Sequence, residues 1–254
     1  MSMNTISING TVLPDIYIDG ALSYNKPKKN IEMISVPGRS GDLTIDYGTW
    51  QNVLITYPCF ARSLSAFEAV INTLGRLSGY QKITCTNDST HYRMGVPIIP
   101  EAPTVKRISN DFYFNLVFNC KPQRYLSSNV SYTIAAGSSL DLVNPTGFQS
   151  EPYLEIDDAG TITFKEVLTS PTALYRQVVA TVTNVDDWPR LFMDCALMEC
   201  WSEEIVGVKQ GENKEVSFSP NEFPVLYANQ DGSKTKVTNG TTASLKIYPR
   251  WWEL

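Results

Sequence analysis

The chain is poor in the residues from which most catalytic and metal sites are built. Histidine occurs once, as His91, in 254 residues. Histidine is the usual general base, and metal sites usually take more than one, so a hydrolytic triad or a zinc site would depend on that single ring. His91 lies within residues 88–92, a run that is typical of a hairpin tip. We therefore interpret it as a surface histidine in a turn.

Cysteine is scarce, and its spacing offers no paired motif. The five cysteines include no Cys-x-x-Cys pair, and they are Cys59, Cys85, Cys120, Cys195 and Cys200. An odd count without a pair argues against a disulfide framework. The N-terminus lacks the basic start and apolar stretch of a signal peptide, and no apolar run approaches the ~18–20 residues of a membrane span. We expect synthesis in a reducing cytoplasm and no membrane partner.

Charge is modest and uneven between the two halves. Residues 1–125 carry 12 basic and 9 acidic residues, a net of +3, whereas residues 126–254 carry 9 and 17, a net of −8. This asymmetry fits two domains with different surroundings. It is too weak for nucleic-acid binding, which needs a clustered basic face.

Two further groups of residues suggest chemistry only weakly. Three acidic doublets suggest the facing carboxylates of a glycosidase, but each lies where a strand ends or a turn begins, as solvated acids do; they are Asp157-Asp158, Asp186-Asp187 and Glu203-Glu204. Aromatic residues of the second half suggest sugar-stacking platforms, although filling a core is the commoner role; they are Tyr153, Trp188, Trp201, Tyr227, Trp251 and Trp252. We predict no catalytic residue, no metal site and no cofactor.

Most of the chain has the pattern of β-strands. In residues 111–120 the side chains of Phe112, Phe114, Leu116, Phe118 and Cys120 alternate with mostly polar ones, which predicts a strand with one apolar face. Residues 121–125 are expected to close that strand. Further strands are predicted at 53–60, 81–86, 161–167, 177–185 and 242–249.

One helix is predicted, over residues 65–78. Ser65 and Glu68 have the spacing of a capping box, and Gly79 follows as a stop. The apolar residues recur at helical spacing and form one face; they are Phe67, Val70, Ile71, Leu74 and Leu77. The expected role of that face is to cover a sheet.

A domain boundary is expected near Leu126, where a stretch rich in Gly, Ser and Asn begins. This gives domains at 1–126 and 127–254. The second half has strand and turn signals without a strong helix, which favours a β-sandwich. The predicted fold class is mainly β with one α-helix.

A tight turn, Gly38-Arg39-Ser40-Gly41, separates two strand-like segments. It fits neither a Walker loop nor a Rossmann turn. Glycines allow positive φ or close backbone approach, and an arginine binds carboxylates or carbonyls with fixed geometry. Two interpretations stay open. Arg39 is either a brace to Asp42 or Asp46 within the chain, or the polar anchor of an interface element spanning residues 36–46.

The order of these motifs resembles the distal tail (Dit) family, the baseplate hub proteins of long non-contractile-tailed bacteriophages. The matching parts are the glycine-arginine-x-glycine turn within residues 34–43, with 46–48 following, the helix at 65–78, the turn at 88–92, the strand at 114–122, and the segments 144–147, 151–156, 223–226 and 247–252. Together they span nearly the whole chain. The chain resembles the short form of the family, because it has no room for an inserted arm or carbohydrate-binding module in the second half.

The resemblance implies a structural virion protein of the tail tip or baseplate, made in the host bacterial cytoplasm, and not an enzyme. It implies an N-terminal tail-tube-like β-sandwich plus helix (1–126) that closes into a homo-hexameric ring, and a C-terminal galectin-like β-sandwich (127–254). The ring would bind the tail tube protein on one face and the tail-tip protein on the other, with receptor-binding proteins attached outside. We expect the interface to include Gly38, Arg39, Gly41, Asp42 and Asp46.

Two other functions stay open at this point. One is a carbohydrate-binding module for a host cell-wall saccharide, and the other is the tail tube protein itself, which shares the N-terminal architecture. Galectins use a histidine on their sugar, and the second half of this chain has none. We therefore expect no binding to simple galactosides.

Overall fold

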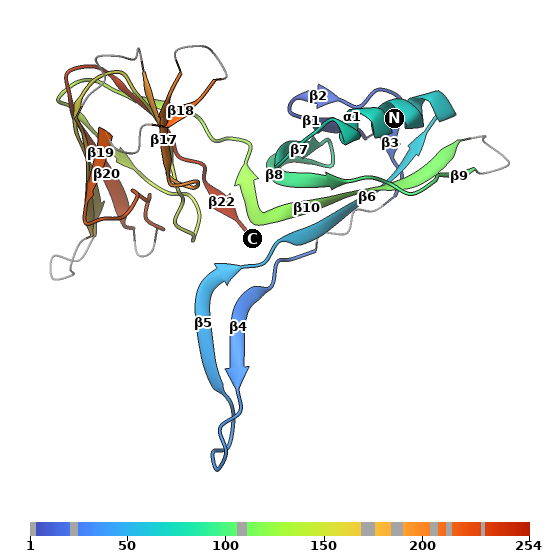
Figure 1. Ribbon diagram of the computed structural model, residues 1–254, viewed down its shortest axis with the longest axis horizontal. Helices are drawn as coiled ribbons and strands as arrows, with labels where there is room; N and C mark the ends of the chain where they lie inside the picture. Colours follow the sequence, from blue (N-terminus) through green and yellow to red (C-terminus); the bar gives the residue numbers. More distant parts are fainter. Residues whose placement is uncertain are drawn as a thin grey trace. The chain divides into compact units, whose positions relative to one another are not determined.

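The computed structural model describes residues 4–20, 25–105, 111–168, 176–183, 190–203, 208–211, 215–229 and 232–254. The chain divides into two compact units, one of residues 1–127 with 254 and one of residues 128–253. The described residues are mostly strands with one α-helix, so the predicted fold class is confirmed (Figure 1).

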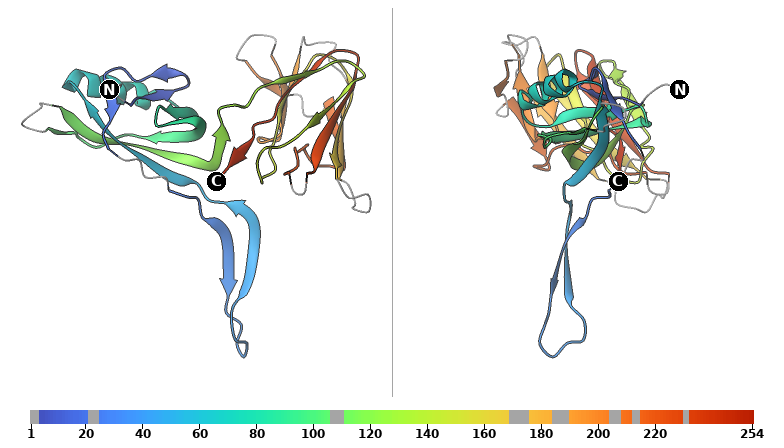
Figure 2. Two further views of the ribbon diagram at one scale, coloured as in Figure 1. Left: turned by 180° about the vertical axis from the view of Figure 1, so that it is seen from behind. Right: turned by 90° about the vertical axis from the view of Figure 1, so that its right-hand side faces the viewer.

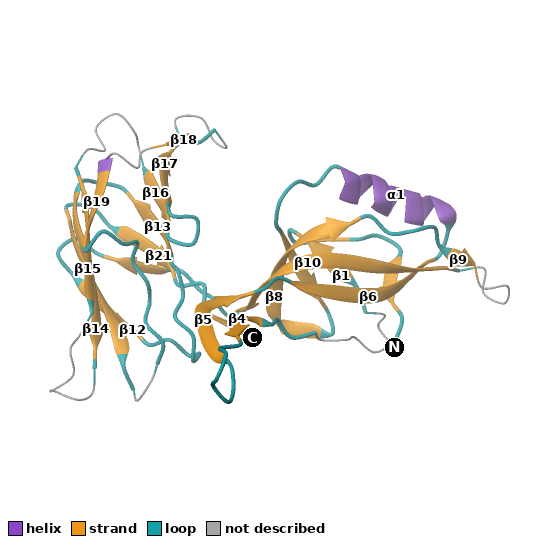
Figure 3. Cartoon of the chain, turned by 60° about the horizontal axis from the view of Figure 1, so that its bottom comes forward, coloured by secondary structure: helices purple, strands orange, loops and turns teal. Residues whose placement is uncertain are grey.

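The N-terminal unit contains ten strands and the helix. They are β1 (Ile6–Ile8), β2 (Thr11–Val12), β3 (Ile16–Ile18), β4 (Lys29–Ile34), β5 (Leu43–Trp50), β6 (Val53–Ala61), α1 (Leu64–Gly75), β7 (Gln81–Cys85), β8 (Asp88–Ile98), β9 (Thr104–Val105) and β10 (Phe112–Leu126). Seven of these strands pair in the order β2-β1-β7-β8-β10-β6-β3, and β9 also pairs with β10. The helix lies over this sheet (Figure 3).

Strand β10 has the apolar face predicted for it. Phe114, Leu116, Phe118 and Cys120 are buried, and Phe112 packs partly buried against the same core. Residues 121–125, predicted to close that strand, form its last part, and the strand ends one residue later at Leu126. A register shift between Cys120 and Arg124 accommodates Pro122, which has no N–H for a regular ladder.

The helix buries the predicted face but begins and ends earlier than expected. Phe67, Val70 and Leu74 are buried in the core cluster. The N-cap is Ser63, whose Oγ accepts the Ala66 N–H at 3.1 Å, and not Ser65. The helix ends at Gly75 because the next N–H groups bond three residues back, a tighter turn that closes the helix before Gly79.

The C-terminal unit contains two sheets, as a β-sandwich requires. Its strands are β11 (Tyr132–Ile134), β12 (Ser139–Leu142), β13 (Tyr153–Ile156), β14 (Gly160–Val167), β15 (Gln177–Val182), β16 (Leu191–Asp194), β17 (Glu199–Ser202), β18 (Gln210–Gly211), β19 (Val216–Ser219), β20 (Lys234–Thr241), β21 (Leu245–Tyr248) and β22 (Trp252–Glu253). One sheet has the order β11-β21-β13-β16-β17-β18 and the other β12-β20-β14-β15-β19. Alternate residues such as Leu154, Ile162 and Val237 are fully buried.

Candidate assembly interface

A long hairpin of β4 and β5 carries the Gly-Arg turn at its tip. The two strands pair only with each other within the described residues, and they form a separate two-stranded sheet. The hairpin projects from the sheet of its own unit (Figures 1 and 2). Every residue from 31 to 49 is exposed. We call residues 29–50 the arm.

The arm exposes an unusual amount of apolar surface. Its exposed large apolar residues are Ile31, Met33, Ile34, Val36, Leu43, Ile45 and Tyr47, with Met33 66% and Tyr47 57% exposed. Large contiguous apolar patches mark interaction sites, and an isolated two-stranded hairpin is marginally stable in water. The arm therefore has the composition of a segment that another surface covers.

The two faces of the arm differ. Ile34 pairs with Leu43, and Glu32 with Ile45, so these residues share one face with Tyr47. The Tyr47 hydroxyl donates a hydrogen bond to the Glu32 carboxylate, and this bond raises the pKa of Tyr47. This face is therefore largely apolar, and the Tyr47–Glu32 hydrogen bond joins the two strands across it.

The opposite face carries an ion pair near the base of the arm. Lys29 pairs with Asp46, and the Gly48 N–H also donates to the Asp46 carboxylate at 2.9 Å. The Lys29 hydrogen bond, followed by that of Gly48, lowers the pKa of Asp46. Ile31, directly across from Asp46, and Met33 lie on the same face. The hairpin register is thus fixed by side chains on both faces.

The tip is a glycine-dependent turn. The Arg39 N–H donates to the Val36 carbonyl at 3.2 Å, which closes a four-residue turn with Pro37 and Gly38 at its centre. Gly38 and Gly41 have φ of +81° and +85°. Proline followed by a residue with positive φ is the pattern of a type II turn, in which glycine is strongly preferred. The two glycines are therefore required by the backbone.

Arg39 is not braced within the described part of the chain. No described residue forms a hydrogen bond or ion pair with its side chain, and Asp46 is paired with Lys29 instead. Asp42 likewise forms no ion pair among these residues. The intramolecular brace that the sequence left open is not formed here. The roles of Gly38, Arg39, Gly41, Asp42 and Asp46 in an interface stay a prediction.

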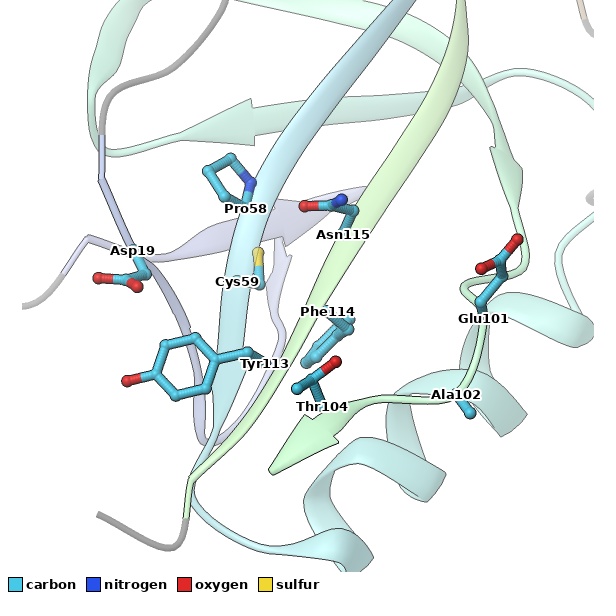
Figure 4. Close-up of a pocket in the computed structure, with 9 residues that line it drawn as sticks. All are labelled: Asp19, Pro58, Cys59, Glu101, Ala102, Thr104, Tyr113, Phe114 and Asn115. Carbon is cyan, nitrogen blue, oxygen red and sulfur yellow. The ribbon is translucent and has the colours of Figure 1, made fainter. Parts of the chain in front are cut away.

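A pocket of about 360 Å³ lies in the N-terminal unit, where β6 and β10 run together (Figure 4). Its nine lining residues are Asp19, Pro58, Cys59, Glu101, Ala102, Thr104, Tyr113, Phe114 and Asn115. Of these described lining residues, two are acidic and none is basic. In the view of Figure 4 the carboxylates of Asp19 and Glu101 lie at opposite ends, with Tyr113 and Thr104 between them. Sequence reasoning missed this pocket, because its residues come from four separate segments.

The catalytic candidates do not come together. His91 lies within β8, not in a turn, and its side chain is only 12% exposed, so its predicted position was wrong. The actual turn is at Thr86 and Asn87, before the strand begins. The Nδ1 atom of His91 lies 3.3 Å from Asp88, which Arg124 also binds. His91 is therefore part of a structural polar cluster.

The acidic doublets are bound locally where the structure describes them. Asp157 pairs with Arg190 at 2.6 Å, and Asp158 accepts the Ala159 N–H at 2.7 Å. Asp186-Asp187 and Glu204 lie outside the described residues. No group of three or more potential metal ligands occurs among the residues that were described.

The cysteines and the described tryptophans of the second half are core residues. All five cysteines are free and buried. Trp201, Trp251 and Trp252 are only 5–6% exposed, and Lys209 covers the Trp201 ring at 3.6 Å. Trp188 lies outside the described residues. The described tryptophans of this unit thus offer no exposed platform for a sugar.

Over the described ranges, no helix has the length and apolar content of a membrane span.

Comparisons with solved structures show which known proteins share this fold. No family model matches the chain, and no curated protein matches it. The Dit protein of phage SPP1, described as a hub of the adsorption apparatus in phages that infect Gram-positive bacteria, is similar in structure with a TM-score of 0.57 and 11% identity, over 97% of this chain and 98% of that one. Chains of the phage P2 baseplate in its activated conformation are also similar. The form with calcium has a TM-score of 0.51 and 6% identity, over 97% of this chain and 98% of that one. The form with strontium has a TM-score of 0.54 and 8% identity, over 96% of this chain and 97% of that one. The chain therefore has the fold of the Dit hub along almost its whole length.

Proposed function

We propose that this protein is a structural virion protein, a distal tail hub that forms a hexameric ring between the phage tail tube and the tail tip. The observation that carries this proposal is the agreement in fold with a Dit hub over 97% of the chain, which includes both units. A fold alone does not specify a function, so the exposed surface must also suit the role.

The arm supplies the surface that a ring subunit needs. A closed ring requires each subunit to present one surface to a different surface of its neighbour. The arm projects from its unit, exposes seven large apolar residues and ends in an arginine that no described residue binds. Burying such residues at a contact is favourable by about 25 cal/mol for each Å² removed from water. The arm is therefore the proposed contact between neighbouring copies.

The two units take different parts in this proposal. Residues 1–126 form the ring, with the tail tube protein on one face and the tail-tip protein on the other. Residues 127–254 form a galectin-like sandwich on which receptor-binding or other host-adsorption proteins are anchored. The protein acts in the virion after synthesis in the host bacterial cytoplasm. Its role in this proposal is structural.

Negative-stain imaging and mass photometry of the purified protein test the proposal. Six chains of 28.4 kDa give a ring of about 170 kDa. The matched control replaces residues 31–46 by a two-residue Asn-Gly turn, which removes the exposed arm and leaves the other sheet pairings intact. We expect rings from the wild-type protein and folded monomers from the control.

Three outcomes would count against the proposal. Long tubes would assign the chain to the tail tube instead of the hub. A protein that remains monomeric at high concentration, and also fails to form rings with its tail partners, would exclude both tail functions. Rings formed equally well by the armless control would show that the arm is not the contact.

A further inference from the structure

The arm tip and the β6–β10 pocket are complementary in charge. Arg39 is an exposed cation for which the described residues supply no partner, and the described lining of the pocket includes two acidic residues and no basic one. We propose that Arg39 of one copy inserts into this pocket of the next copy, where the Glu101 carboxylate binds its guanidinium. This inference rests on the proposed ring and names the receiving site within it.

The geometry of the arm carries its tip toward another molecule. Strand β5 has eight residues, which at ~3.4 Å each extend about 27 Å, and Arg39 lies beyond the outer end of that strand. Residues 31–49 are exposed throughout, so the arm does not fold back on its own sheet. Gly38 and Gly41 have positive φ and flank Arg39 at the tip, where Ser40 and Asp42 are also exposed.

The pocket is suited to an arginine side chain. Its volume of about 360 Å³ is in the lower part of the range of small-ligand sites. Glu101 is exposed, and no described residue forms a hydrogen bond or ion pair with it. A carboxylate accepts the two parallel N–H groups of a guanidinium, and the Tyr113 ring forms part of the pocket wall.

A second copy of this chain is the occupant because tip and pocket are different surfaces of one subunit. Each copy then gives one tip and receives one, which is the heterologous contact that a closed ring repeats. The apolar residues along the arm are buried in the same contact, and the ion pair fixes its register. Like charges placed together at such a contact cost several kcal/mol, so the pairing also excludes wrong alignments.

Charge reversal gives a test that separates this contact from general loss of stability. The Arg39→Glu variant has an acidic tip and an acidic pocket, whereas the Glu101→Arg variant keeps its basic tip and gains a basic residue in its pocket. We expect each variant alone to stay monomeric, with an association constant at least about tenfold lower than that of the wild type.

Combining the two reversals should restore assembly. In an equimolar mixture the two variants can alternate around the ring, so that each tip meets a pocket of opposite charge on the other variant, and rings should form. The double variant Arg39→Glu/Glu101→Arg carries both changes in one chain and should form rings without mixing. A general loss of stability would not be repaired in either way.

Matched controls and a direct crosslink complete the test. Arg76→Glu, at the C-cap of α1, and Glu68→Arg, within the helix, make the same charge reversals at exposed positions, and each alone should assemble like the wild type. In the Arg39→Cys/Glu101→Cys variant, oxidation with copper phenanthroline should link copies into covalent hexamers, since all five native cysteines are buried.

The outcomes distinguish the contact from the ring itself. If the wild type forms rings and the single variants also assemble normally, the Arg39 contact is wrong, although the proposed hub function stands. A mixture of the two variants that stays monomeric while the wild type forms rings has the same meaning. A wild-type protein without any contact between copies would overturn both. Crosslinked hexamers and assembly restricted to the mixture and the double variant are the results that support the pairing.

Discussion

Replacing Arg250 by alanine should lower the free energy of unfolding of the C-terminal unit, because Arg250 forms an ion pair with the buried Asp194. The Arg250 guanidinium binds both oxygens of Asp194, at 2.7 and 2.8 Å. The Asp194 side chain is 9% exposed and that of Arg250 27%. Asp194 also accepts the N–H groups of Ala196 and Leu197, so it holds the turn between β16 and β17.

The expected cost follows from leaving one charge of this pair behind. Removing one partner of a buried ion pair costs about 3–5 kcal/mol, and partial exposure of Arg250 reduces this through solvent screening to about 2–3 kcal/mol. For a unit of this size that corresponds to a fall in Tm of roughly 6–10 °C. Arg190→Ala is the matched control, because Arg190 is 44% exposed and binds Glu155 and Asp157 at the surface. It should cost at most about 1 kcal/mol.

The cost should also depend on pH. Burial raises the pKa of the Asp194 carboxyl, but the hydrogen bonds and charge of Arg250 outweigh it and hold that pKa below its usual value. A lowered folded-state pKa stabilises the protein above the unfolded value of about 3.9, and the effect is lost as the pH falls toward the folded-state pKa. Without Arg250, burial favours protonated Asp194. The deficit of Arg250→Ala should therefore be full at pH 7, shrink as the pH falls, and be smallest below the folded-state pKa of Asp194 in the wild type.

Thermal unfolding of the wild type and both variants, followed by tryptophan fluorescence, measures the Tm of the C-terminal unit. Four of the five tryptophans lie in residues 128–253, so the signal comes mainly from this unit. Equal melting of Arg250→Ala and wild type at pH 7 would refute the reasoning. So would an Arg190→Ala variant that loses as much stability, because burial would then not be the reason for the difference.

Four further predictions concern the helix, the arm, the boundary and sugar binding. Leu74→Asp should leave the N-terminal unit unfolded or insoluble, because Leu74 is 2% exposed and an unpaired buried charge costs several kcal/mol, whereas Asn72→Asp on the exposed face should melt like the wild type. Arg39→Ala should shift light scattering toward monomer at unchanged monomer Tm; a lower Tm would mean an internal brace. Limited proteolysis should cut first within residues 127–131 and give two fragments of ~14 kDa each, and a first cut elsewhere would move the boundary. Calorimetry with simple galactosides should show no binding, and saturation at sub-millimolar ligand would favour the lectin function.

The fold class was predictable because its signals are local. The alternation in β10 and the helical spacing of Phe67, Val70 and Leu74 each state which side of an element is buried, and burial follows as predicted. Element ends were less predictable. The capping-box spacing of Ser65 and Glu68 predicted a cap at Ser65, whereas the structure places the N-cap two residues earlier, at Ser63. Residues 121–125 were expected to close β10, and a register shift between Cys120 and Arg124 lets the strand pass Pro122 and end at Leu126.

The candidate site was predictable in part. The Gly38–Gly41 turn was visible because glycine is needed at positive φ, and the apolar residues on both sides of it indicated strands. Their exposure was not visible, because alternating Ile, Met and Leu ordinarily indicate a face turned to the core. The pocket was beyond reach, since Asp19, Glu101 and Tyr113 are far apart in sequence and meet only through strand order.

The arm combines an exposed apolar surface along its length with a charged residue at its tip. A hairpin with seven exposed large apolar residues loses stability as a free element, yet the chain keeps it long and fixes its register with Lys29–Asp46 and Tyr47–Glu32. Such a register is useful only if the tip must reach a defined place, because one residue of slip would exchange the two faces. Exposed apolar strands also invite non-specific pairing. In the proposed contact, the charged Arg39 at the tip selects a site that holds a carboxylate. A subunit that closes a ring needs both properties, strong attraction along the arm and selection at its tip.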